Sequence, residues 1–270
     1  MKEGISILGC GWLGFPLALT LKNAGYHIKG SKTSENGVAQ LNESGIIGYK
    51  IEVFENKVIG PFDDFLSNSE TLIIDIPPKL RTNPMGDFTK KIKTLLPHIH
   101  SSELKNIIFV SSTSVYENGF PFPIYDESSP TKPESKAGKQ LLKSEVLLKT
   151  QPNLKTTIIR FGGLVANDRH PARILSGKMN VKNPKAPINL IHREDCIGLI
   201  LKIIGKNAFG YTINAVFPEH PSKSEYYQHI CNKMKLPVPQ FDFNSVSIGK
   251  RINSQLGQEL LSFKYKHPIY

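Results

Sequence analysis

Ile5–Gly25 reads ISILGCGWLGFPLALTLKNAG, and this stretch decides the fold. A short apolar run meets three glycines, and the apolar residues that follow recur at helical spacing. A strand, a glycine turn and a helix in this order are typical of the first βαβ unit of a dinucleotide-binding domain. Gly9 permits the tight turn, Gly11 lets the backbone approach a pyrophosphate, and Gly14 lets the helix pack closely on the strand. The stretch therefore predicts a protein that binds a nicotinamide dinucleotide through Gly9, Gly11, Trp12, Leu13 and Gly14.

The same apolar run has a second interpretation, as a secretory signal peptide. Glu3 dilutes the positive charge that such a peptide carries before its apolar part, and no small-residue cleavage site follows. Pro16 instead falls in the first turn of a helix, where its missing N–H costs nothing, and Gly25 falls where that helix should end. The dinucleotide-binding interpretation is preferred, and no other segment is long and apolar enough to span a membrane.

The composition is that of a globular protein of 270 residues, 39% of them hydrophobic, which is enough for one large core or one core plus a smaller lobe. The cysteines at positions 10, 196 and 231 lack the spacing of a zinc site, so we expect no metal and a reducing compartment, by default the cytoplasm. The net charge of +11 suits nucleic acid, an anionic membrane or phosphorylated ligands. Because the lysines are scattered, we expect no nucleic-acid partner. We also expect a small-molecule substrate, no membrane partner, and a monomer or homodimer.

Strand-like runs rich in Ile, Val and Thr alternate with helix-like stretches over residues 1–162. The strands are expected at 5–8, 26–30, 71–76, 106–111 and 156–161, and the helices near 14–24, 38–44, 87–99 and 136–150. This alternation predicts an α/β fold with a Rossmann-type, doubly wound parallel sheet in the order 3-2-1-4-5-6. Prolines and basic residues become frequent afterwards. Residues 163–270 are therefore expected to form mainly a smaller substrate-binding lobe, with part of 188–216 returning to the sheet.

The end of the second strand indicates which dinucleotide is bound. An NAD-binding protein usually carries an acidic residue there, which bonds the ribose 2′-OH, whereas this chain has Ser31, Lys32 and Thr33. A lysine and hydroxyl groups can bind a 2′-phosphate, so NADP(H) is predicted in preference to NAD(H). The alternative is a solvated turn whose lysines touch nothing.

The fourth strand is expected to end at a rigid segment. Ile76, Pro77 and Pro78 follow it and are predicted to wall the pyrophosphate and ribose. A plain strand stop explains the two prolines equally well.

Residues 109–116 read FVSSTSVY and resemble the S-S-x-x-V-Y signature of the extended short-chain dehydrogenases, the group of nucleotide-sugar epimerases and dehydratases. The likeness covers almost the whole chain: residues 126–130 resemble the family's acidic loop, 191–195 its I-H-x-x-D segment, and 249–268 its closing pattern. It implies a dinucleotide cofactor and oxidoreductase or epimerase chemistry. By this match Ser112 takes the place of the serine that orients the substrate carbonyl, and Ser111 lies beside the cofactor.

The resemblance fails at the catalytic helix. The family's P-x-S-x-Y-G-x-S-K-x-x-x-E becomes PESKAGKQLLKSE at residues 133–145, which puts Ala137 at the tyrosine and Leu141 at the lysine. Both members of the proton-transfer pair are therefore missing. An alternative register pairs Ser135 with Lys139 on one helix face, but it forfeits the other positions that match.

The catalytic candidates that remain are strand-end hydroxyls, namely Ser112 and then Thr113, with Tyr116 as an outside candidate. The preferred function is an NADP(H)-binding oxidoreductase of unknown substrate that resembles the nucleotide-sugar epimerases and dehydratases. The alternative is a catalytically silent dinucleotide-binding protein, acting as a redox sensor or regulator. The missing pair favours the second, whereas the retained serine, the substrate lobe and the closing segment favour the first.

Overall fold

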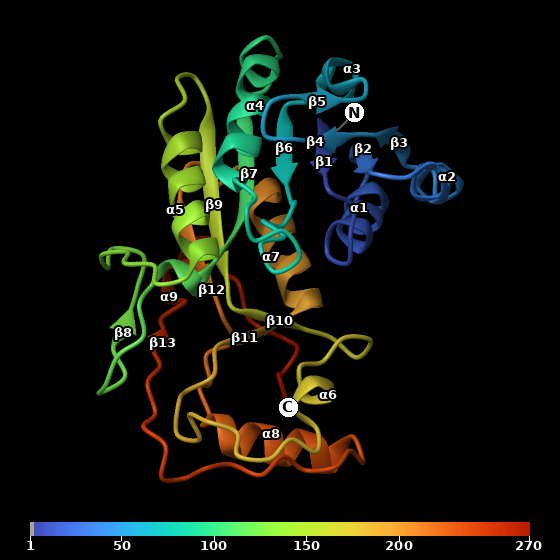
Figure 1. Ribbon diagram of the computed structural model, residues 1–270. Coiled ribbons are helices and arrows are strands. Elements are labelled where there is room, and N and C mark those ends of the chain that lie inside the picture. The colour runs from blue at the N-terminus through green and yellow to red at the C-terminus, as the bar shows by residue number, and fades with distance from the viewer. Residues whose placement is uncertain (1–2) are drawn as a thin grey trace. The chain divides into compact units, whose positions relative to one another are not determined.

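A sheet of seven strands organises the computed structural model, which describes residues 3–270 (Figure 1). The strands lie in the order β12-β9-β7-β6-β1-β2-β3. Their bounds are Gly4–Leu8 (β1), His27–Lys32 (β2), Ile47–Lys50 (β3), Thr71–Ile74 (β6), Asn106–Ser112 (β7), Lys155–Phe161 (β9) and Thr212–Ala215 (β12).

The strands of this sheet run parallel. β1 pairs in parallel with β2 and β6, β2 with β3, and β6 with β7. The backbone N–H of Ile158 bonds the carbonyl of Tyr211, and that of Gly162 bonds the carbonyl of Ala215. The bonds advance by four residues along both segments, so β9 and β12 are parallel too. Read from β3 to β9, the observed order confirms the predicted order 3-2-1-4-5-6. β12 adds a seventh strand next to β9.

Helices connect the central strands and cover them. They are α1 (Gly14–Asn23), α2 (Glu35–Glu43), α4 (Phe88–His100) and α5 (Lys136–Lys149). All four residues of β6 are buried, which requires cover on both faces of the sheet and explains why its sequence does not alternate. Three of these helices begin at a side-chain cap, since Ser34, Asp87 and Ser135 each accept a backbone N–H from the first turn. Ser34 caps α2, which begins at Glu35, three residues before the predicted start at position 38; that prediction followed the apolar pattern alone.

The chain divides into two compact units. The first comprises residues up to Ser112, Ser135–Ile159 and Ile200–Thr212. Besides most of the sheet it contains the hairpin of β4 (Glu52–Val53) and β5 (Val58–Ile59) and the helix α3 (Phe62–Leu66). Helix α7 (Arg193–Gly205) contributes its second half to this unit.

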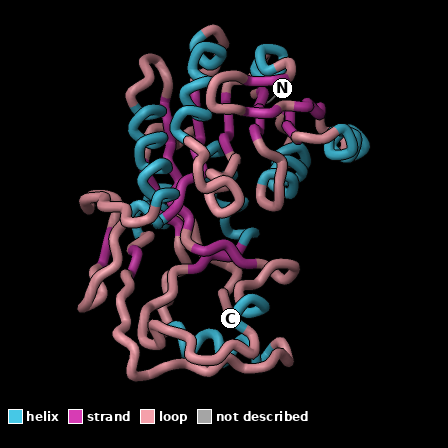
Figure 2. The backbone as a smooth tube through the Cα atoms, in the orientation of Figure 1, coloured by secondary structure: helices cyan, strands magenta, loops and turns pink. Residues whose placement is uncertain are grey.

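The second unit comprises Thr113–Glu134, Arg160–Leu199 and Ile213–Tyr270. Figure 2 shows that loops make up much of it. Two short parallel pairs and three helices lie among the loops: β10 (Gly163–Val165) with β11 (Leu190–His192), β8 (Ile124–Tyr125) with β13 (Arg251–Ile252), α6 (Ala172–Leu175), α8 (Lys223–Lys233) and α9 (Gln255–Leu261). It has an apolar core of its own, built around Tyr226, Ile230 and Ile269. Within residues 3–270, no helix combines the length and the apolar character that a bilayer crossing requires.

Candidate functional site

The glycine turn between β1 and α1 uses its three glycines differently. Gly9 has a φ of +104°, and a Cβ placed on it would lie 2.6 Å from the carbonyl oxygen of Asp75. A Cβ on Gly14 would lie 2.3 Å from the carbonyl oxygen of Gly9. A Cβ on Gly11 would meet no atom within 4 Å. Two of the glycines are thus required by the protein's own packing, while the third leaves the backbone open to a ligand.

Ser31 at the end of β2 holds this turn from inside the protein. Its Oγ accepts a hydrogen bond from the backbone N–H of Gly9 at 2.9 Å, and its carbonyl oxygen accepts one from Cys10 at 2.9 Å. The residue is only 2% exposed. The predicted contact residue Ser31 therefore shapes the turn, and the exposed edge beside it is formed by Lys32 and Thr33.

A cavity of about 300 Å³ opens beside the turn, at the carboxyl ends of β1, β2 and β6. Ligands of doubly wound folds bind at this edge of the sheet. The predicted cofactor residues that line it are Gly9, Gly11, Ser31, Lys32, Thr33, Ile76 and Pro77, whereas Trp12, Leu13, Gly14, Pro78 and Ser111 do not. The remaining lining includes two lysines that the sequence pattern did not single out, Lys79 and Lys91.

Three lysines therefore surround one small cavity, an arrangement that suits a phosphorylated ligand. Lys32 extends over the ring of Phe15, with its Nζ 5.5 Å from the ring centroid. Two residues further along, Ser34 caps α2 and Glu35 is the first helical residue. The carboxylate of Glu35 pairs with Lys50 at 3.0 Å, so this acidic group has a cation of its own.

Asp75 is the one acidic residue in this lining. It follows β6, and its carboxylate accepts a hydrogen bond from the backbone N–H of Gly14, the first residue of α1. Burial raises the pKa of Asp75 to about 8, against the opposing effect of that hydrogen bond. This environment favours the protonated form of the carboxyl group more than water does. The signal in the sequence was a single aspartate closing an otherwise apolar strand.

Cys10 also lines the cavity but is chemically quiet. Its side chain is fully buried, and burial raises the pKa of the thiol to about 12. A thiol with so little thiolate at neutral pH is a poor nucleophile and a poor metal ligand.

The predicted catalytic strand ends with three hydroxyl residues in different settings. The Oγ of Ser111 donates a hydrogen bond of 2.5 Å to the carboxylate of Glu145 on α5, and both residues are buried. Ser112 is half-buried and ends β7, and Thr113, 7% exposed, begins a 3-10 turn. Ser111 thus fastens the strand to the helix behind it, and Ser112 is the more accessible of the two catalytic candidates.

Tyr116 belongs to the second unit and is 1% exposed. Its hydroxyl accepts a hydrogen bond from Arg160 Nη1 at 2.7 Å and lies 3.0 Å from Asn214 Oδ1. Its ring stacks on that of Tyr125, with 4.9 Å between centroids. Burial raises the pKa of Tyr116, and the nearby Arg160 only partly opposes this. The geometry suits a structural role better than proton donation.

Helix α5 carries Ala137 and Leu141 one turn apart, where the resemblance calls for tyrosine and lysine. Leu141 is buried, at 6% exposure, and Ala137 is half-buried. Ser135 is the N-cap of the helix and accepts a 3.0 Å hydrogen bond from the backbone of Gly138, while Lys139 is exposed. The hydroxyl of the alternative pair is therefore already used to start the helix.

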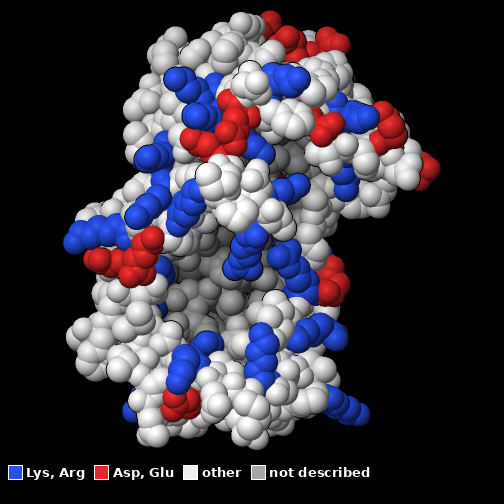
Figure 3. Space-filling view, viewed as in Figure 1, with Lys and Arg blue, Asp and Glu red and all other residues white. Residues whose placement is uncertain are grey.

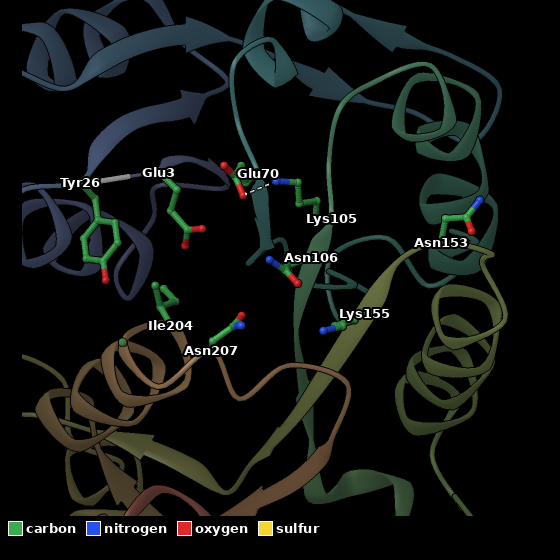
Figure 4. Close-up of a pocket in the computed structure, with 10 residues that line it drawn as sticks. Glu3, Tyr26, Glu70, Lys105, Asn106, Asn153, Lys155, Ile204 and Asn207 are labelled. Carbon is green, nitrogen blue, oxygen red and sulfur yellow. Dashed lines mark hydrogen bonds and ion pairs between the residues drawn. The ribbon is translucent and has the colours of Figure 1, made fainter. Parts of the chain in front are cut away.

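The first unit has a larger cavity, of about 690 Å³, at the amino edge of the sheet. Figure 4 shows the side chains of Glu3, Asn106 and Lys155 directed toward it, with Glu70 paired to Lys105 at its rim, at 2.9 Å. None of the predicted site residues lines it. Its walls carry acidic and basic side chains that form no recognisable catalytic or ligand-binding arrangement. The smaller cavity at the carboxyl edge of the sheet is therefore the better candidate for the functional site.

The second unit contains a cavity of about 500 Å³ whose walls include His192 and His267. The two rings stack with 5.0 Å between centroids, and His267 Nδ1 lies 2.9 Å from the carboxylate of Asp195. Asp195 is buried and also accepts the backbone N–H groups of Lys266 and His267. The aspartate of the I-H-x-x-D segment thus anchors the closing segment of the chain to α7.

Comparisons with known proteins place this geometry in context. No family model matches the chain. It is 33% identical over 277 residues to Protein YeeZ of Escherichia coli (strain K12), covering 99% of this chain and 97% of that protein.

Solved structures of other proteins share the fold, among them the following two. A short-chain dehydrogenase/reductase superfamily protein from Agrobacterium tumefaciens with bound NAD superposes with a TM-score of 0.79 at 17% identity, over 98% of this chain and 93% of that one. UDP-glucuronic acid 4-epimerase from Bacillus cereus in complex with NAD gives a TM-score of 0.80 at 15% identity, with the same two coverages, 98% and 93%.

Proposed function

We propose that this chain, which belongs to the YeeZ family of extended short-chain dehydrogenase-like proteins, binds a nicotinamide dinucleotide at the carboxyl edge of its sheet and acts as an oxidoreductase. The observation that carries the proposal is the glycine turn: Gly9 and Gly14 are packed against the protein, and Gly11 is open beside a lysine-lined cavity. The turn leads into the N-terminus of α1, and the positive end of a helix dipole favours a negatively charged pyrophosphate there. The NAD bound by the Agrobacterium and Bacillus structures supports the same class of ligand.

The finer proposal is a preference for NADP(H) over NAD(H). No aspartate or glutamate closes β2, and Lys32 lines the cavity there with Thr33. The nearest carboxylate along the chain, Glu35, is paired with Lys50. A lysine that meets a 2′-phosphate gains a charge-assisted hydrogen bond, worth about 1.5 kcal/mol or slightly more where it is partly exposed.

Calorimetry with NADPH and NADH tests the proposal directly. We expect NADPH to bind more tightly, and Lys32→Ala to weaken NADPH about tenfold while leaving NADH unchanged. Lys93→Ala removes an exposed lysine of α4 outside the cavity and is the matched control. Equal affinities for the two dinucleotides, or an equal effect of Lys32→Ala on both, would contradict the preference. Failure of both to bind would contradict the function itself.

The dinucleotide supplies hydride transfer when it is bound, and the protein must orient and polarise a carbonyl or hydroxyl substrate. Ser112 is the residue proposed for this role, followed by Thr113. The substrate is a small molecule of unassigned structure.

A catalytically silent dinucleotide-binding sensor or regulator is the second candidate. The observation that favours it is the pair of apolar side chains, Ala137 and Leu141, on the helix where proton-transfer groups are expected. The two candidates share the same ligand and differ only in turnover.

A further inference from the structure

We infer that Asp75 couples dinucleotide binding to a proton, so that the ligand binds only while this carboxyl group is protonated. The inference rests on the proposed dinucleotide site and adds a binding determinant to it. Asp75 lies outside the glycine motif and directly follows a different strand, β6, 61 positions after Gly14 in the chain.

The geometry puts the carboxyl group directly against the turn. The backbone N–H of Gly14 donates to it, and a Cβ on Gly14 would lie 3.1 Å from Asp75 Oδ2. Helix α1 has no side-chain cap of its own, because its N-cap residue is Leu13. Asp75, just after β6, thus bonds the backbone N–H of Gly14 at the start of α1, where the helix has no side-chain cap. Its carboxyl group lines the same cavity as Gly9 and Gly11.

A pyrophosphate beside this turn would bring further negative charge to the half-buried carboxyl group of Asp75, which lines the same cavity. Two anions that share one partly buried site cannot both stay ionised without a large cost, so the weaker acid keeps its proton. A dinucleotide pyrophosphate is the stronger acid, and the proton therefore stays on Asp75. A protonated carboxyl group can also donate a hydrogen bond, which an ionised one cannot.

The other charged and titratable groups around Asp75 are few. Cys10 reaches the cavity from the turn, Lys32 from β2, Lys79 from the loop after β6 and Lys91 from α4. The thiol does not ionise at these pH values, because burial raises its pKa to about 12. The lysines supply positive charge for phosphates, yet burial remains the largest influence on the pKa of Asp75, which it raises to about 8.

The direction of the pH effect follows from proton linkage. Below about pH 8 the free protein already holds the proton, and the dinucleotide binds without exchange. Above that pH one proton must be taken from solvent for each ligand bound, so the dissociation constant should rise about tenfold per pH unit.

Calorimetry with NADPH between pH 7 and 9.5, in buffers of different ionisation enthalpy, measures both quantities. For the unaltered protein we expect affinity to fall above pH 8 with uptake of one proton per ligand. Asp75→Asn keeps the shape and cannot titrate, so its affinity should be independent of pH. Asp64→Asn, at an exposed aspartate of the same unit, should behave like the unaltered protein.

The outcomes are distinguishable. Zero proton uptake by the unaltered protein at pH 9 overturns the inference, whatever the variants do. An unchanged pH dependence in Asp75→Asn overturns it as well. If NADPH and NADH fail to bind at every pH, the proposed function fails instead.

Discussion

Gly9, Gly11 and Gly14 belong to one motif, but their surroundings predict different consequences of the same substitution. Gly9→Ala and Gly14→Ala force a methyl group against backbone oxygens, and the first also strains a positive φ, so each should lower the free energy of unfolding by about 2 kcal/mol or more. Gly11→Ala meets open space and should leave stability within about 0.5 kcal/mol.

Denaturant unfolding and calorimetry together check this contrast. Gly11→Ala should weaken dinucleotide binding at least about tenfold, because the methyl group occupies the side on which the ligand approaches. A Gly11→Ala protein that binds as tightly as the unaltered one would show that the ligand approaches the turn elsewhere.

At this scale the sequence predicts which strands are neighbours but not the register that decides where each side chain lies. The glycine spacing gave the turn from neighbouring residues alone. The inward orientation of Ser31 depends on the pairing of β1 with β2, in which Ile7 lies opposite Gly30. The approach of Asp75 to Gly14 likewise depends on the register of β6 against β1, in which Leu8 lies opposite Ile74.

At the scale of elements, helix α5 decides what catalysis can be expected. With Ala137 and Leu141 in place of a phenol and an ammonium group, we expect little or no tyrosine-dependent turnover of simple alcohols, ketones or nucleotide sugars. Any residual NADPH oxidation over a carbonyl panel should depend on a polarising hydroxyl. Ser112→Ala should then slow single turnover about a hundredfold, the usual effect of removing one such donor.

Two variants serve as controls for this measurement. Tyr116→Phe removes a buried hydroxyl that bonds Arg160, so we expect lower stability and an unchanged rate. Lys139→Ala removes an exposed lysine and should change neither. A loss of rate confined to Lys139→Ala would instead support the alternative pair with Ser135.

Helix positions were predictable because caps and apolar spacing are local signals. α4 and α5 begin and end within one residue of their expected bounds. The start of α2 differs from the prediction because Leu41 is its one fully buried residue, so its apolar pattern is weak. The helix begins instead where Ser34 caps it.

For the whole molecule, the net charge of +11 raises the question of nucleic acid. Figure 3 shows Lys and Arg spread over the visible face, with Asp and Glu among them, and not gathered into one stripe. We therefore expect DNA or RNA binding no stronger than that of any basic protein, and steeply weakened by salt. Fluorescence anisotropy with labelled duplex and single-stranded probes measures this. Nanomolar binding at physiological salt would demote the oxidoreductase proposal.

The order of the central strands was predictable because right-handed crossovers leave few topologies for alternating strands and helices. The division into units was a harder problem. Composition changes after Gly162, yet Thr113–Glu134 belongs to the second unit through contacts such as the pairing of β8 with β13. No local property of residues 113–134 reveals partners that lie so far along the chain.

Interleaving of the two units also sets an order of events on the ribosome. The chain passes between them after Ser112, Glu134, Ile159, Leu199 and Thr212. Tyr116 is synthesised 98 residues before Asn214, whose side-chain oxygen accepts a hydrogen bond from the Tyr116 hydroxyl group. At about 5–20 residues per second, the nascent segment that carries Tyr116 waits roughly 5–20 s for that partner. The second unit therefore cannot complete its hydrogen bonds to Tyr116 until this later part of the chain has been made.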